Sequence, residues 1–130
     1  MKSSRFARLA LATAFVALAT GAVHAGGGHA HGPRHVGVVR TLHDVSYELV
    51  AKPESLTLYV SDHGKPIPTA GVAAEAVIQA GNETRTVKLE PAGENRLVAA
   101  GSFRVGLGVR VVVTTTLPGK PPARAVFNLK

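Results

Sequence analysis

The chain has no cysteine and no tryptophan, and the lack of cysteine excludes several kinds of site. Without it there is no disulfide, no thiolate nucleophile and no Cys-based zinc site. A domain without disulfides must be stabilised by its hydrophobic core, which about 100 residues can provide. A site for a transition metal must therefore use imidazole first, and the chain has 6 histidines.

Aromatic residues make up only 5% of the chain, and the basic residues do not cluster. The formal net charge of +7 includes three basic residues at the N-terminus; the rest of the chain has a net charge of +4. A nucleic-acid site normally needs a basic stripe and aromatic side chains on which bases stack. We therefore predict no nucleic-acid partner.

Residues 1–25 have the pattern of a secretory signal peptide. Three basic residues precede an apolar run at 9–18, and Val23 and Ala25 occupy the small-residue positions of a cleavage site. We place the cut after Ala25. An uncleaved anchor is the alternative, but the run is short for a bilayer span of about 20 residues. The mature protein is predicted to be exported, with no membrane insertion after cleavage.

Glycine and histidine dominate the next segment, 26–42, which lacks apolar periodicity and is predicted to be a flexible arm. Residues i and i+2 of an extended chain point to the same side, so His29 and His31 can meet one cation. A turn at Gly32-Pro33 can bring His35 to the same cation. Imidazole suits divalent transition metals such as Zn(II), Cu(II), Ni(II) and Co(II). We predict that the arm binds one of these ions.

Two alternatives stay open for the arm. A mature chain that began at Gly27 would start Gly-Gly-His, whose amine, amides and His29 ring can surround Cu(II) or Ni(II) in a square plane. A cut after Ala25 puts His29 fourth and prevents that arrangement. The histidines can instead be solvated and have no specific role. Three histidines within seven residues favour metal binding over this last alternative.

Residues 43–130 alternate apolar and polar side chains, which is typical of antiparallel strands. The segment 62–71 has two prolines and two glycines and cannot continue a central strand. Three hairpins are predicted, over 44–62, 72–90 and 109–129. Together with a further strand from Arg96, they predict one all-β domain, a seven-stranded antiparallel sandwich of the immunoglobulin-like type.

A second candidate site lies where the first predicted hairpin begins and ends. His43 begins the first strand and Asp62-His63 ends the second, and antiparallel pairing puts these ends side by side. Two imidazoles and a carboxylate suffice for a zinc or copper site, and a neighbouring carboxylate can orient a ring. The alternative, which we favour for His63 and for Asp44, is that these are solvated turn residues.

The sequence gives little support for catalysis. No serine lies in a Gly-x-Ser-x-Gly turn, and no glycine-rich phosphate loop follows a strand and opens a helix. The glutamates are spread along the chain with no evident pair for acid–base chemistry. We therefore predict that the protein is not an enzyme.

One resemblance rests mainly on the run LTLYVSDHGKPIPTAG at 56–71, followed by LEPAGENRLVAAGSF and VRVVVTTTLPGKPPARAVFNL. Over roughly residues 35–130 the chain resembles a small periplasmic domain of Gram-negative bacteria. That domain occurs alone or fused to the adaptor (membrane-fusion) subunits of cobalt–zinc–cadmium type heavy-metal efflux systems. The resemblance implies a periplasmic β-sandwich associated with metal efflux, with a His-rich leader and an Asp-His pair that here is Asp62-His63. The chain lacks the other domains of an adaptor, so it cannot itself bridge pump and channel.

These observations predict a periplasmic, non-catalytic protein that binds a divalent transition metal and passes it to an efflux adaptor. The metal ligands are predicted in two ranks, first His29, His31 and His35, and then His63 and His43. The rival prediction is a metal-independent module that adds an exposed strand edge to the sheet of an envelope partner. The run 109–117 or the closing strand would provide that edge, although we prefer to place 109–117 as a buried central strand.

Overall fold

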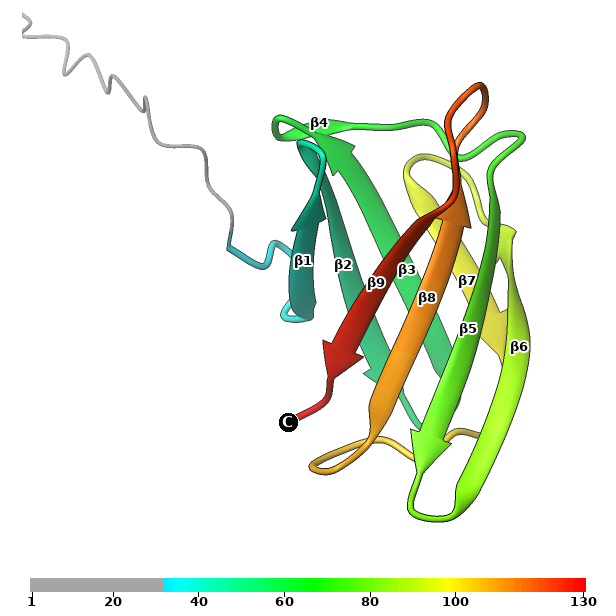
Figure 1. Ribbon diagram of the computed structural model, residues 1–130. Coiled ribbons are helices and arrows are strands. Elements are labelled where there is room, and N and C mark those ends of the chain that lie inside the picture. The colour runs from blue at the N-terminus through cyan, green and yellow to red at the C-terminus, as the bar shows by residue number, and fades with distance from the viewer. Residues whose placement is uncertain (1–31) are drawn as a thin grey trace, which may run out of the picture.

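The computed structural model describes residues 32–130, and these form nine antiparallel β-strands (Figure 1). The signal peptide, His29 and His31 lie outside the described residues. No helix within 32–130 is long and apolar enough to cross a membrane. In chain order the strands are β1 (Val38–Leu42), β2 (Val45–Lys52), β3 (Ser55–Asp62), β4 (Lys65–Pro66), β5 (Ala73–Ala80), β6 (Glu83–Pro91), β7 (Arg96–Ala100), β8 (Arg110–Thr116) and β9 (Ala123–Asn128).

Eight of the strands curl into a nearly closed barrel, in the order β1-β2-β3-β7-β6-β5-β8-β9, while β4 pairs with β3 alone. The first and last strands of this order, β1 and β9, face each other across a seam. Arg40 of β1 spans the seam: its Nε donates to the carbonyl of Val126 on β9 at 2.8 Å, and its Nη1 donates to the carbonyl of Val39 at 3.2 Å. A side chain thus bridges the two strand edges.

The prediction of a seven-stranded immunoglobulin-like sandwich is wrong. The short strands β1 and β4 add to the seven predicted ones, and pairing of β3 with β7 joins the hairpins into one sheet. Strand β6 makes the join continuous, because it pairs with β5 up to Leu89 and then with β7 at Glu90 and Pro91. Alternation shows which face of a strand is buried but not which strand lies beside it, so it does not separate a sandwich from a barrel.

The hairpin predictions are confirmed, since β2 pairs with β3, β5 with β6 and β8 with β9, each antiparallel. Strand β8 pairs on both sides, with β5 and with β9. The run 109–117 is therefore a central strand and gives a partner no free edge. Residues 38–42, which the sequence places in the arm, form β1 and pair with β2.

The core fills the inside of the barrel with alternate residues of the strands. Leu56, Leu58 and Val60 of β3 are buried, as the alternation predicts, and Phe127 of β9 is among the largest fully buried side chains. Burying such side chains stabilises the fold by roughly 1.5–3 kcal/mol each. Burial also raises the pKa of the Tyr47 phenol, so this group stays protonated and packs as a core aromatic.

Candidate functional site

A buried carboxylate holds the segment that leads into β1. Glu48 lies on the outward side of β2 yet is only 6% exposed, because residues 34–37 cover it. Its Oε1 accepts the N–H of Arg34 at 2.9 Å, and its Oε2 accepts the N–H groups of His35 at 2.8 Å and of Gly37 at 2.9 Å. Burying a charge is costly unless it is hydrogen-bonded, and three backbone donors offset that cost here.

This arrangement accounts for the unusual backbone of Val36. Its φ is 63° and its side chain is 95% exposed, although β-branched residues avoid the left-handed region. The N–H groups on either side of it, from His35 and Gly37, both donate to Glu48 Oε2. Two N–H groups spaced in this way converge on one anion when the backbone between them turns left-handed, as in an anion-binding nest. The strain at Val36 follows from wrapping the chain around the carboxylate.

Two further contacts fix the same segment. A Cβ at Gly37 would lie 2.5 Å from the carbonyl oxygen of Leu49, so only glycine allows this approach to β2. The imidazole of His35 stacks on the phenol of Tyr59 on β3, with centroids 3.7 Å apart and planes inclined by 10°. Tyr59 is the register partner of Glu48, so the two side chains form one platform for the arm. His35 is thereby fixed against the barrel.

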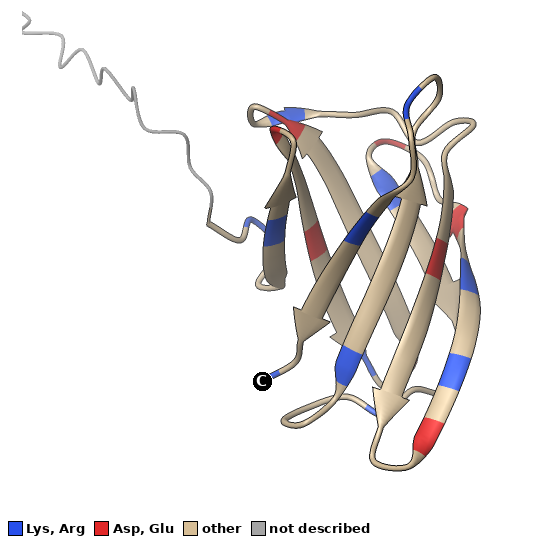
Figure 2. Cartoon of the chain, viewed as in Figure 1, with Lys and Arg blue, Asp and Glu red and all other residues tan. Residues whose placement is uncertain are grey.

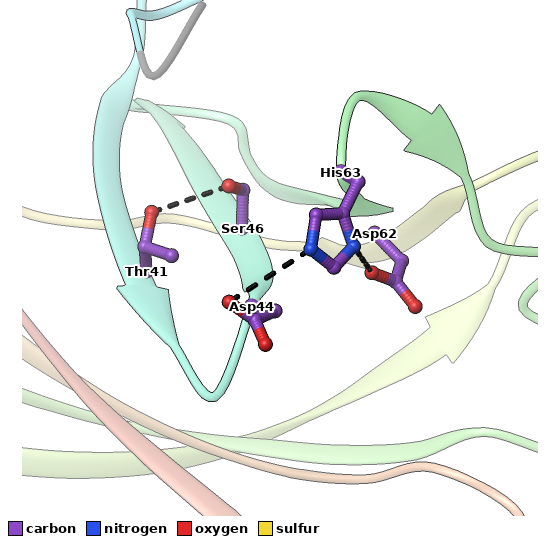
Figure 3. A network of polar contacts seen from close by, with 5 residues as sticks. All are labelled: Thr41, Asp44, Ser46, Asp62 and His63. Carbon is purple, nitrogen blue, oxygen red and sulfur yellow. Dashed lines mark hydrogen bonds and ion pairs between the residues drawn. The ribbon is translucent and has the colours of Figure 1, made fainter. Parts of the chain in front are cut away.

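The second predicted cluster lies where β1 turns into β2 and β3 turns into β4 (Figure 3). The Nδ1 of His63 is hydrogen-bonded to Asp62 Oδ1, and the Nε2 of the same ring lies 3.9 Å from Asp44 Oδ1. The backbone N–H of His63 donates to the carbonyl of Asp44 at 3.4 Å, which ties the two turns together. The ring of His63 therefore lies between two carboxylates.

Across the two turns, the Nε2 of His63 faces the carboxylate of Asp44. His43 is exposed and precedes Asp44 in the same turn. Figure 3 shows Asp44 reaching toward the ring, while Thr41 and Ser46, 3.2 Å apart at their hydroxyls, join β1 to β2 close to the turn. Asp44 is thus the residue that the sequence gave least reason to choose, because its turn position alone accounts for an aspartate.

The anchored arm passes beside this cluster. A Cβ at Gly64 would lie 3.0 Å from Nη2 of Arg34, so the Arg34 side chain reaches the turn that carries His63. Within residues 32–130, no group of three or more His, Cys, Asp or Glu side chains could by itself hold a metal ion. A complete site at this turn needs further donors, and the predicted mature chain before residue 32 has two in His29 and His31.

A hollow of about 320 Å³ lies between β4 with the segment that follows it and the turn from β6 to β7. Three prolines line it, Pro66, Pro68 and Pro91. The hydroxyl of Thr69, also in its lining, donates to backbone carbonyls and is buried. The lining therefore offers little polar chemistry to a ligand.

The surface charge is mixed in sign. Figure 2 shows Lys and Arg interspersed with Asp and Glu along the strands and loops. Lys88 pairs with Glu90 and Arg104 with Glu83, each at 3.6 Å and well exposed, and such pairs contribute at most about 1 kcal/mol. The face in this view has no continuous basic stripe of the kind that binds nucleic acid.

No protein-family model, no curated protein and no solved structure matches the chain. The resemblance to the efflux-associated periplasmic domain therefore stays a prediction, and the site has to be argued from its own geometry.

Proposed function

We propose that this is a periplasmic, non-catalytic protein that binds a divalent transition metal and serves heavy-metal efflux or homeostasis. The observation that carries the proposal is the position of the arm. Glu48 holds the Arg34 backbone on β2, and the Arg34 side chain reaches Gly64, beside His63. The described chain therefore enters the barrel beside a histidine, and the sequence places His31 and His29 shortly before this point.

Chain length supports this arrangement. His31 precedes Arg34 by three residues and His29 precedes it by five. An extended chain covers about 3.3–3.6 Å per residue, so His31 has a reach of about 10 Å from the anchor. A short tether raises the effective concentration of one ligand near another, so imidazoles that bind a metal weakly on their own can bind it together.

The exposure of the cluster supports a carrier and not a structural metal site. The side chains of His63 and Asp44 are 57% and 78% exposed, so a bound ion would stay accessible to a partner. Imidazole and carboxylate donors suit Zn(II), Cu(II), Ni(II) and Co(II). An efflux adaptor is the partner that we propose to receive the metal.

The test is a titration of the mature protein with Zn(II), followed by calorimetry and by intact mass under native conditions. We expect one tightly bound ion, and an affinity at least 100-fold lower in the variant His29→Ala/His31→Ala/His35→Ala, because three imidazole donors are lost. The double variant His29→Ala/His31→Ala keeps the stack on Tyr59 and separates ligand loss from loss of the anchor. Glu75→Ala, which changes an exposed carboxylate on β5, is the control and is expected to bind as the wild type does.

Two results would contradict the proposal. One is a wild-type protein that takes up no stoichiometric Zn(II), and the other is a triple variant that binds as tightly as the wild type. Either result would favour a metal-independent interaction module. The partner would then be expected to bind at the seam between β1 and β9. These two strands are joined there by a side chain, and a partner strand can add to such an edge.

A further inference from the structure

We infer that the barrel supplies two adjacent ligands to this metal site, His63 Nε2 and a carboxylate oxygen of Asp44, and that Asp62 is the positioning residue for the His63 ring. The inference rests on the proposed function, since it names the groups with which the barrel meets a metal carried by the arm. It assigns a ligand role to Asp44, which the sequence reads as a turn residue, and a positioning role to Asp62.

The contact with Asp62 fixes which ring nitrogen faces Asp44. An ionised carboxylate can only accept hydrogen bonds, so His63 Nδ1 carries the proton and donates to Asp62 Oδ1. In the neutral ring, the lone pair is then on Nε2, the nitrogen that lies 3.9 Å from Asp44 Oδ1. Metal-binding histidines usually donate their other ring N–H to a carboxylate or carbonyl in this way, which fixes the tautomer and strengthens the ligand.

The spacing of the two proposed donors suits a single small cation. Zinc lies about 2.0–2.1 Å from a histidine nitrogen and about 2.0–2.2 Å from a carboxylate oxygen, so tetrahedral ligands are about 3.4 Å apart. The observed 3.9 Å differs from this by about half an ångström. Rotation of the exposed Asp44 side chain can close that gap without moving the backbone.

The backbone around the two donors is fixed. The N–H of His63 donates to the carbonyl of Asp44, and the residues next to them in the chain, Asp62 and Val45, are register partners in the β2–β3 ladder. The two turns that carry the donors are therefore held together by backbone pairing. Arg34 places a guanidinium nitrogen near Gly64, in the turn that follows His63. Its side chain is exposed and can move aside when a divalent ion binds.

The test compares Zn(II) affinity in the mature chain and in three variants that each lose one negative charge. Asp44→Asn keeps a residue that tolerates the left-handed backbone at this position, where φ is 68°. Asp62→Ala removes the acceptor for Nδ1. The control is Glu54→Ala, in the turn at the other end of β2 and β3. We expect Asp44→Asn and Asp62→Ala to weaken binding about 10- to 100-fold, and Glu54→Ala to change it less than about twofold.

Nitrogen NMR of the metal-free protein gives a second readout, which a merely structural role of Asp62 would not move. We expect the His63 ring to carry its proton on Nδ1 in the wild type and to lose this preference in Asp62→Ala. A proton on Nε2 in the wild type overturns the role of Asp62, whether or not metal binds.

The affinities separate the inference from the proposed function. If the wild type binds Zn(II) and both aspartate variants bind as tightly as Glu54→Ala, the inference is overturned and the proposed function stands on the arm alone. If the wild type binds no Zn(II), the proposed function fails and the inference fails with it.

Discussion

At the scale of single residues, Glu48 determines where the histidine arm meets the barrel. Its carboxylate accepts three backbone N–H groups from residues 34–37 and is almost fully buried by them. A hydrogen bond to a charged group contributes about 1.5–3 kcal/mol net, although the cost of burying the charge offsets part of this. Removing the charge should therefore loosen the arm first and the barrel only secondarily.

We expect Glu48→Gln to lower the free energy of unfolding by about 1–3 kcal/mol, because a neutral amide accepts these bonds more weakly. Urea unfolding measures this change, and hydrogen exchange at the amides of Arg34, His35 and Gly37 localises it. Glu75→Gln, which changes an exposed carboxylate on β5, is the matched control. Unchanged exchange at the three amides would show that the carboxylate does not hold the arm.

The sequence predicts the direction of the Glu48 side chain but not its surroundings. Alternation with Tyr47 and Leu49 puts Glu48 on the outward side of β2, and the structure agrees. Its burial comes from a segment more than ten residues away along the chain, which no pattern within β2 contains. Asp44 is a similar case, because the contact that gives it a role is with the far end of a different strand.

At the scale of elements, β1 shows why a strand was missed. It has five residues, and Arg40 interrupts the side of the strand that carries Val38 and Leu42. Its alternation is therefore too short and too mixed to be recognised. It forms a strand because its backbone pairs with that of β2 and because Gly37 allows the chain to lie close to β2. Hairpins such as β2–β3 were predictable because the turn and both strands are local in sequence.

We expect Gly37→Ala to push β1 away from β2. The new Cβ would lie 2.5 Å from Leu49 O and 2.9 Å from Glu48 Cγ, and neither neighbour can move without breaking the ladder or the anchor. Overpacking of this kind typically costs about 1–3 kcal/mol in the free energy of unfolding. Gly32→Ala, at a site where a Cβ meets nothing within 4 Å, is the control. Equal unfolding midpoints for the two variants would contradict the close approach.

At the scale of the whole molecule, two strand pairings decide between a sandwich and a barrel. Strand β3 pairs with β7, and β6 passes from β5 to β7 at Glu90. The first joins strands far apart in the sequence, and the second requires β6 to leave β5 and pair with β7. Alternation predicts neither, so the strand count and the inward faces are compatible with either fold. The sequence predicts the hairpins and the inward faces of β2 and β3, whereas the closure of the barrel depends on contacts between its first and last strands.

Closure can be tested at Arg40, whose guanidinium donates to carbonyls of both seam strands. Each exposed hydrogen bond contributes about 0.5–1.5 kcal/mol, and 1.4 kcal/mol is a tenfold change in an opening equilibrium. We therefore expect Arg40→Ala to speed hydrogen exchange about tenfold at the β1 amides that pair with β2, and to leave exchange in the central strand β8 unchanged. Arg124→Ala removes an exposed cation from β9 and is the control. If the two variants exchange alike, the packing of Val38 and Leu42 against the core holds β1 in place, and the barrel closes without its arginine bridge.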